Sequence, residues 1–292
     1  MKSKKPGSIM EIATTDVVTL PPTTTIMAAA KTMKTYRFRR LPIADPGTRR
    51  IEGIITATDL VNFFGGGEKH GIINGKYSGN YLAAVNEDVK SIMERDVFTL
   101  EYTEDIEDGL NLMLKKGIGG FPIVDEEGRV TGIVTERDYL SYLAKKCKLE
   151  GNVSEYMTKG VITINSDTKI KDAMKLMISR KIRRLPVIDE GLLIGWINTP
   201  MIVRYFSGEV FKSLITGNIE EALNQPASVI LSSDSSGYVA PLTVTPETTM
   251  SEVARRMLDM KVGCALVVRD NKLEGIITER DMVRFLYKCE VK

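Results

Sequence analysis

Little in this chain of 292 residues suits catalysis or metal binding. It contains one histidine, His70, and three cysteines, Cys147, Cys264 and Cys289. The cysteines lack the spacing of metal ligands, and their odd number fits reduced thiols better than a disulfide framework. No serine lies in a Gly-x-Ser-x-Gly turn, so a nucleophile motif is missing too. We therefore expect no catalytic residues, no metal site and no required cofactor.

Long apolar runs and a strong net charge are missing as well. Hydrophobic residues make up 43% of the chain, but no run approaches the roughly 20 residues that a membrane helix needs. The first eight residues are basic and polar, and no apolar segment of signal-peptide length follows them. A net charge of +2 gives no general attraction for nucleic acid. We expect a cytoplasmic protein with neither a membrane nor a nucleic acid as partner.

The chain does contain one pattern that is repeated four times. Each copy has apolar residues at i, i+3, i+4 and i+7, which is typical of a helix packed on one side. These helices are predicted to begin at Ile26, Ile106, Ile170 and Met250, so their spacing alternates between 80 and 64 residues. The alternation indicates that the copies come in pairs and that the odd copies carry an insertion of about sixteen residues.

Two short apolar segments joined by a turn follow each of these helices, and a second helix follows them. The first segments of the four hairpins are Leu41–Asp45, Phe121–Asp125, Leu185–Asp189 and Ala265–Arg269. A short leading strand, such as Val17–Leu20, is expected before each first helix. One copy is too short to bury both faces of its sheet, so each copy should pack against a partner copy.

The second apolar segment ends in Thr-x-x-Asp in three of the four copies. These pairs are Thr56 with Asp59, Thr135 with Asp138, and Thr278 with Asp281. The third copy keeps the apolar frame but has Asn198 and Met201 at these positions. Because the frame survives without the polar pair, the pair favours a ligand site over a packing role. Helix capping is the simpler alternative, since a helix N-terminus favours an acidic group.

Arginines gather just before the Leu-Pro of the odd copies. They are Arg39 and Arg40 in the first copy, and Arg183 and Arg184 in the third. The even copies have Gly119, Gly120 and Gly263 there instead. A solvated basic helix end is the ordinary alternative to a binding role.

Together, the Gly-Ile-Ile-Thr-x-x-Asp segments, the Leu-Pro strands and the paired spacing resemble the cystathionine beta-synthase (CBS) domain. CBS domains pair into Bateman modules and bind adenosine-containing ligands between repeats. With four copies, the chain is similar to the archaeal stand-alone four-CBS proteins and to the gamma subunit of AMP-activated protein kinase. The resemblance implies an α+β fold of four tandem CBS repeats, forming two Bateman modules packed head to tail as a disk. The modules would span 1–148, with repeats at about 9–65 and 89–147, and 149–292, with repeats at about 153–207 and 238–290.

The resemblance also assigns roles to the motif residues. Asp59, Asp138 and Asp281 would accept hydrogen bonds from the ribose hydroxyls, with Thr56, Thr135 and Thr278 facing the ligand. A vicinal diol presents two donors and an ionised carboxylate offers two acceptor oxygens, so the chemistry matches. Arg39, Arg40, Arg183 and Arg184 would bind phosphates, and Arg137, Arg280 and Thr58 are weaker candidates. Guanidinium suits this role because it is always charged and binds phosphate oxygens bidentately. Basic residues of the first insertion, such as Lys69, could also reach a phosphate.

The resulting hypothesis is a non-catalytic sensor that binds AMP, ADP or ATP and acts on a regulated partner protein. Three alternatives stay open: a binder of S-adenosylmethionine, a nucleic-acid-binding CBS protein, and an enzyme that turns over ATP. Four arginines argue against S-adenosylmethionine, which carries no phosphate. The oligomeric state is undecided between a monomer and a homodimer.

Overall fold

The computed structural model describes residues 7–146, 149–214, 217–233 and 237–290. The first helix of each repeat is α1 (Ile26–Tyr36), α5 (Ile106–Lys116), α8 (Ile170–Ser179) or α13 (Met250–Asp259). All four begin at the predicted residue, and their buried faces are the apolar faces read from the sequence. The side chains of Thr25 and Thr249 cap α1 and α13 by accepting a backbone N–H. All four helices therefore bury the faces that their apolar periodicity predicts.

Each helix is followed by an antiparallel hairpin. The hairpins are β1 (Arg40–Ala44) with β2 (Ile51–Thr56), β4 (Gly120–Val124) with β5 (Val130–Thr135), β8 (Arg184–Asp189) with β9 (Leu192–Asn198), and β11 (Cys264–Arg269) with β12 (Lys272–Thr278). The leading strands β3 (Leu100–Glu101), β7 (Ile164–Asn165) and β10 (Thr243–Val244) have two residues each and pair in parallel with the hairpin. In the first repeat only Leu20 pairs, with Ile43. The predicted strand Val17–Leu20 is thus too long, and Pro21, which has no N–H to donate, follows its single paired residue.

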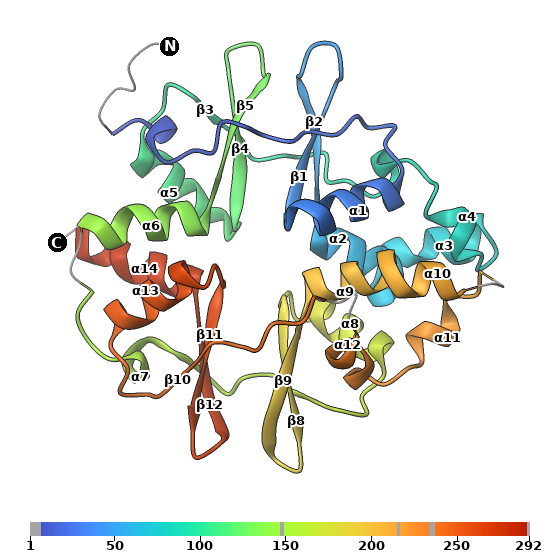
Figure 1. Cartoon of the computed structure of the whole chain (residues 1–292). Helices are drawn as coiled ribbons and strands as arrows, with labels where there is room; N and C mark the ends of the chain where they lie inside the picture. The colour runs from blue at the N-terminus through green and yellow to red at the C-terminus, as the bar shows by residue number, and fades with distance from the viewer. Residues whose placement is uncertain (1–6, 147–148, 215–216, 234–236, 291–292) are drawn as a thin grey trace.

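The second helix of each repeat decides how the two modules pack. These helices are α2 (Ala57–Val61), α6 (Glu136–Lys146), α9 (Thr199–Tyr205) and α14 (Glu279–Glu290). Helix α2 lies against α9, and α6 lies against α14 (Figure 1). Odd repeats therefore face odd repeats and even repeats face even ones. A head-to-tail packing would set odd against even, so that prediction is wrong.

The insertions of the odd repeats explain this packing. The π-helix η2 (Asn62–Gly66) packs on α8 so closely that a Cβ on Gly66 would overlap the side chain of Ile178. Phe64 of the first repeat stacks on Phe206 of the third, with ring centroids 5.1 Å apart. The remaining short helices here are η3 (Glu68–His70), α3 (Gly71–Lys76), α4 (Tyr81–Ala84), η5 (Phe206–Val210), α10 (Phe211–Ser213), α11 (Glu220–Leu223) and α12 (Ser228–Ser232). One apolar core joins repeats one and three, and a second joins repeats two and four.

Exchanged segments tie the two repeats of each module together. The 3-10 helix η1 (Ile9–Glu11) opens the first repeat but packs in the core of the even repeats, and Thr14 bridges Ile133 of β5. The second module repeats this exchange with α7 (Val153–Tyr156) and with β6 (Thr158–Lys159), which pairs with β12. In the reverse direction, η4 (Val89–Ser91) packs beside α1 of the first repeat. Each module is therefore held by its own chain crossings as well as by the shared cores.

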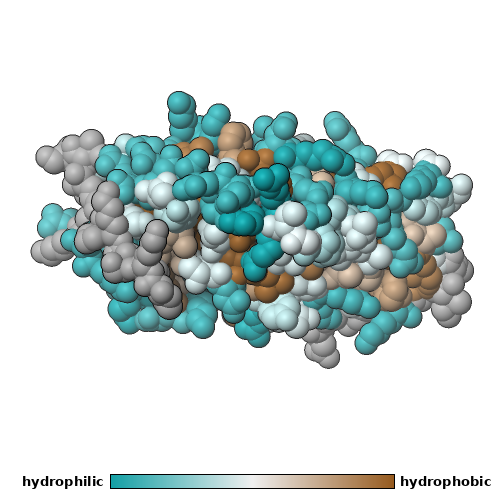
Figure 2. All heavy atoms as spheres, turned by 90° about the horizontal axis from the view of Figure 1, so that it is seen from above, coloured by the Kyte–Doolittle hydropathy of each residue, from teal (hydrophilic) through white to brown (hydrophobic). Residues whose placement is uncertain are grey.

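The four repeats form a flat body, as the edge-on view shows (Figure 2). The predicted disk of α+β repeats is confirmed. Cys264 is buried with a free thiol, and burial raises its pKa; Cys147 and the side chain of Cys289 lie outside the described residues. Within the described part of the chain no helix is long and apolar enough to cross a membrane.

Candidate nucleotide-binding site

The Thr-x-x-Asp motif has the same geometry in the three repeats that carry it. The Thr135 backbone N–H and Oγ1 both donate to Oδ2 of Asp138, at 2.8 and 2.6 Å. The Thr278 and Asp281 pair shows 2.9 and 2.6 Å, and the Thr56 and Asp59 pair 2.8 and 2.6 Å. The capping alternative is therefore real, and each threonine orients its aspartate. The cap engages Oδ2, so Oδ1 is the oxygen that can serve a ligand.

The third repeat keeps the cap and loses the carboxylate. Oδ1 of Asn198 accepts the backbone N–H of Met201 at 3.0 Å, which replaces the threonine as cap of α9. Met201 is 1% exposed and packs in the core of the odd repeats. An uncharged thioether at this position offers a ribose diol only a weak acceptor.

In the first repeat, Oδ1 of Asp59 already accepts a hydrogen bond from a side chain of the same chain. Lys69, from the first insertion, donates to Oδ1 of Asp59 and to the backbone carbonyl of Ile92. The structure thus directs Lys69 to a carboxylate rather than to a phosphate position. Lys76 of the same insertion pairs with Glu87.

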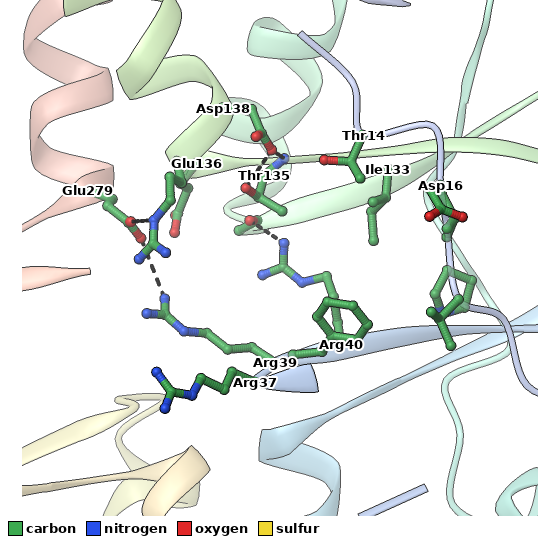
Figure 3. Close-up of a pocket in the computed structure, with 16 residues that line it drawn as sticks. Thr14, Asp16, Arg37, Arg39, Arg40, Ile133, Thr135, Glu136, Asp138 and Glu279 are labelled. Atoms are coloured by element: carbon green, nitrogen blue, oxygen red, sulfur yellow. Dashed lines mark hydrogen bonds and ion pairs between the residues drawn. The ribbon is translucent and has the colours of Figure 1, made fainter. Parts of the chain in front are cut away.

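A hollow of about 300 Å³ lies between the first two repeats (Figure 3). The segment Thr14–Val18, which the chain exchange lays on the second repeat, forms one wall. Apolar surface comes from Val17, Val18, Phe38, Pro42 and Ile133. Thr135 and Asp138 reach the hollow from the junction of β5 and α6, and Arg37, Arg39, Arg40 and Arg137 also line it. The hollow combines an apolar wall, a carboxylate and several guanidinium groups.

Two buried glutamates form ion pairs with these arginines. Neither glutamate was among the site residues predicted from the sequence. Glu279, 4% exposed, accepts from Arg137 Nε at 2.8 Å and from Arg39 Nη1 at 3.5 Å. Glu136, 5% exposed, accepts from Arg280 Nε at 2.6 Å and from Arg183 Nη2 at 3.4 Å. Every one of these ion pairs joins the two modules. The sequence did distinguish these glutamates. Both even motifs read Thr-Glu-Arg-Asp, whereas the odd ones have Ala57 and Thr199 after the cap residue.

The glycines of the even repeats are explained by the arginines of the odd ones. Arg40 donates to the carbonyl of Gly119, and Arg184 Nη2 donates to that of Gly263 at 3.1 Å. A Cβ on Gly120 or Gly263 would overlap one of these guanidinium groups. The two sequence patterns, arginine in odd repeats and glycine in even ones, are therefore one packing arrangement.

The arginine cluster carries more positive charge than its carboxylates neutralise. Burial, together with neighbouring arginines, lowers the pKa of Arg39 and Arg40 to about 10, which still leaves both charged near neutral pH. Burial opposes ionisation of Glu136, but Arg183 and Arg280 hold its pKa below the usual range. Arg137 Nη2 is buried and finds no hydrogen-bond partner among the described residues. An unsatisfied buried donor beside excess positive charge suits an anionic ligand.

The candidate residues from the sequence thus fall into two matched groups and a remainder. Asp138, Thr135, Arg39, Arg40 and Arg137 meet in one hollow of the first module. Asp281, Thr278, Arg183, Arg184 and Arg280 make the matching contacts in the second module. In the first repeat Thr58 stands where the even motifs have Arg137 and Arg280. Among the described residues no group of His, Cys, Asp or Glu side chains could hold a metal ion.

The CBS domain family model matches residues 9–66, 89–145, 153–208 and 239–288. The chain belongs to the CBS domain family. Protein MJ1225 of Methanocaldococcus jannaschii is 35% identical to this CBS protein over 280 residues, covering 95% of this chain and 98% of the relative. The solved structure of MJ1225, presented as a candidate archaeal homologue of γ-AMPK, is 34% identical with a TM-score of 0.88 and covers 95% of this chain and 99% of its own. A Pyrococcus horikoshii structure, 21% identical with a TM-score of 0.58 over 96% of this chain and 99% of its own, shares the fold. The predicted family and its four tandem repeats are confirmed.

Proposed function

We propose that this CBS protein is a non-catalytic regulatory sensor that binds AMP, ADP or ATP. The observation that carries the proposal is the buried Arg137 Nη2, a donor with no hydrogen-bond partner among the described residues, beside a hollow that also presents Asp138. A ligand with a diol for the carboxylate and a phosphate for the guanidinium groups satisfies both. The apolar wall of Val17, Phe38 and Ile133 suits a purine base.

We place the two principal sites at the even repeats. In the first module, Asp138 Oδ1 would accept from the ribose while Thr135 holds the carboxylate in place, and Arg39, Arg40 and Arg137 would bind phosphate. In the second module, Asp281, Thr278, Arg183, Arg184 and Arg280 would take the same roles. Asp59 and Thr56 would complete a third site only if Lys69 withdrew, with Thr58 as a weak phosphate contact.

The arrangement also supports a regulatory role. The phosphate-binding arginines pair with glutamates of the opposite module, so a nucleotide that engages them changes contacts between residues 1–148 and 149–292. A ligand shifts a conformational equilibrium when it binds one state better than the other. We propose that a partner protein in the cytoplasm responds to this change, and that the nucleotide is released intact. A homodimer that presents two such disks is compatible with the same scheme.

Titration calorimetry tests the proposal. AMP, ADP and ATP should bind with about two principal sites per chain, and adenosine more weakly because it has no phosphate for the arginines. S-adenosylmethionine should compete poorly with AMP. Tighter binding of S-adenosylmethionine than of every nucleotide would replace this proposal with the adenosyl alternative. Incubation with ATP and Mg²⁺, followed by chromatography, should show no ADP; turnover lost in an Asp281→Ala variant would make the protein an enzyme.

A further inference from the structure

The carboxylates of Glu136 and Glu279 contact the arginine cluster in the way that a bound anion would. Each is at most 5% exposed, and each accepts from two guanidinium groups. Glu279 lines the hollow that holds Asp138, and its two carboxylate oxygens face Arg39 and Arg137 (Figure 3). These are the guanidinium groups to which the proposed function assigns the phosphate. In this structure a carboxylate therefore stands where a phosphate would bind.

Each glutamate pairs with arginines of the site in the opposite module. Glu279 lies two residues before Asp281 but occupies arginines of the Asp138 site. Glu136 lies two residues before Asp138 but occupies Arg183 and Arg280 of the Asp281 site. The exchange follows from the fold, because α6 and α14 begin with these glutamates and pack against each other. Each site thus receives its carboxylate from the helix that carries the other site's aspartate.

We propose that Glu279 and Glu136 are built-in competitors for phosphate, each weakening the nucleotide site of the opposite module. The proposal rests on the proposed function, because it concerns the same arginines. A phosphate that binds Arg39 and Arg137 displaces the Glu279 carboxylate, which is buried and must find another donor. Displacement moves the first residue of α14, next to Arg280 and Asp281. Binding at one site is therefore sensed at the first turn of the helix that carries the other.

The test uses variants in which only one even site remains. In Asp281→Ala protein, which retains the Asp138 site, Glu279→Gln should tighten AMP binding about tenfold. Glu136→Gln should tighten it no more than about threefold, because Glu136 lines the same hollow but pairs with Arg183 and Arg280. In Asp138→Ala protein the two glutamine substitutions should exchange their effects. Glutamine keeps the length of the side chain and removes its charge, so the guanidinium groups become available without a cavity. The affinity of adenosine should not change, since adenosine has no phosphate to compete.

Two controls separate competition from a general effect on the fold. Glu252→Gln removes a carboxylate that pairs with Arg256 along α13, and should leave AMP binding unchanged. Glu279→Asp keeps the charge but shortens the reach to Arg39, so it should tighten AMP binding less than Glu279→Gln does. Thermal melts of each variant without ligand show whether it folds, and the aspartate variant carries the test if the glutamine variant does not.

The outcomes distinguish this inference from the function on which it rests. Wild-type protein that binds no AMP would refute the proposed function itself. Wild-type protein that binds AMP, with effects that do not cross between the modules or that appear equally with adenosine, would refute only the competition. Weaker AMP binding in Glu279→Gln protein would also refute it, because the glutamate would then position the arginines for phosphate.

Discussion

The first and second repeats carry the same Thr-x-x-Asp motif in different surroundings. In both, the threonine donates to Oδ2 of the aspartate at 2.6 Å and the carboxylate caps the next helix. At Asp59 the other oxygen accepts from Lys69, whereas Asp138 lines a hollow with Arg39 and Arg137. The comparison shows that the motif supplies a cap and an oriented carboxylate, and that the neighbouring segments decide whether it is open to a ligand.

The difference can be traced to the residues that face each motif from the partner repeat. The Asp138 site receives Arg37, Arg39 and Arg40 from the end of α1 and the start of β1. The corresponding positions after α5 are Gly117, Gly119 and Gly120, and Arg40 lies over the last two. The arginines that line the Asp138 site therefore need glycines at the facing positions. Those glycines bring no positively charged side chain to the Asp59 motif from the second repeat.

The largest effect should come from removing both even aspartates. Asp138→Ala with Asp281→Ala removes the carboxylates that we propose accept from the ribose at both principal sites. A hydrogen bond to a charged group contributes about 1.5 to 3 kcal/mol, so each site should weaken by about ten- to a hundredfold. Asp59→Ala is the matched control and should leave AMP calorimetry nearly unchanged. Unchanged AMP affinity in the double variant would show that AMP does not bind at Asp138 and Asp281.

A somewhat smaller effect is expected from the arginines. Arg39→Gln with Arg40→Gln should weaken AMP about tenfold at the Asp138 site and leave adenosine nearly unchanged, because guanidinium contacts phosphate. Arg255→Gln is a suitable control, since Arg255 pairs with Asp259 on the exposed face of α13. Calorimetry with both ligands decides the matter. Equal losses for AMP and adenosine would mean that these arginines hold the fold together.

Removing the Lys69 ammonium group should make the Asp59 motif more like the Asp138 motif. Lys69→Met removes the ammonium group from Asp59, so a further weak site should appear in adenosine titrations. Because glycines replace the arginines there, AMP should gain no more than about twofold over adenosine at this new site. Lys76→Met, which breaks the exposed pair with Glu87, controls for loss of a charge in the same insertion. An unchanged stoichiometry would indicate that something other than Lys69 closes the site.

The smallest effect concerns pH. Burial raises the pKa of Asp138, although hydrogen bonds from Thr135 oppose the shift. Because the folded pKa exceeds the unfolded one, this group favours the folded state most below the unfolded pKa and loses that contribution as pH rises through the folded pKa. The ribose needs the ionised form, so adenosine affinity in Asp281→Ala protein should fall as the pH is lowered toward the folded pKa of Asp138, and the fall should begin at a higher pH than for an ordinary aspartate. Adenosine has no ionising phosphate, so an affinity that falls only in the pH range of an ordinary aspartate, or below it, would contradict the shift.

Local patterns in the sequence predicted most of the repeat unit. The buried faces of α5, α8 and α13 follow from helical periodicity, which depends on residues three and four apart. The Thr-x-x-Asp cap is equally local, because its partners are three residues apart. Head-to-tail packing was predicted wrongly, because the choice depends on Phe64 meeting Phe206, residues that are distant in the chain.

The sequence by itself determined the four helix faces, the hairpins, the Thr-x-x-Asp caps and the residue types from which a ligand site could be built. Only the tertiary structure decided which of these groups meet. It placed Lys69 on Asp59, Arg40 over Gly120, and Glu279 against Arg39 and Arg137 of the other module. The physical reason is that capping and periodicity act within one or two turns of chain, whereas a charge is neutralised by whichever opposite group the packing brings within a few ångströms. That packing was set by the two apolar cores, which join repeats that are not neighbours in sequence.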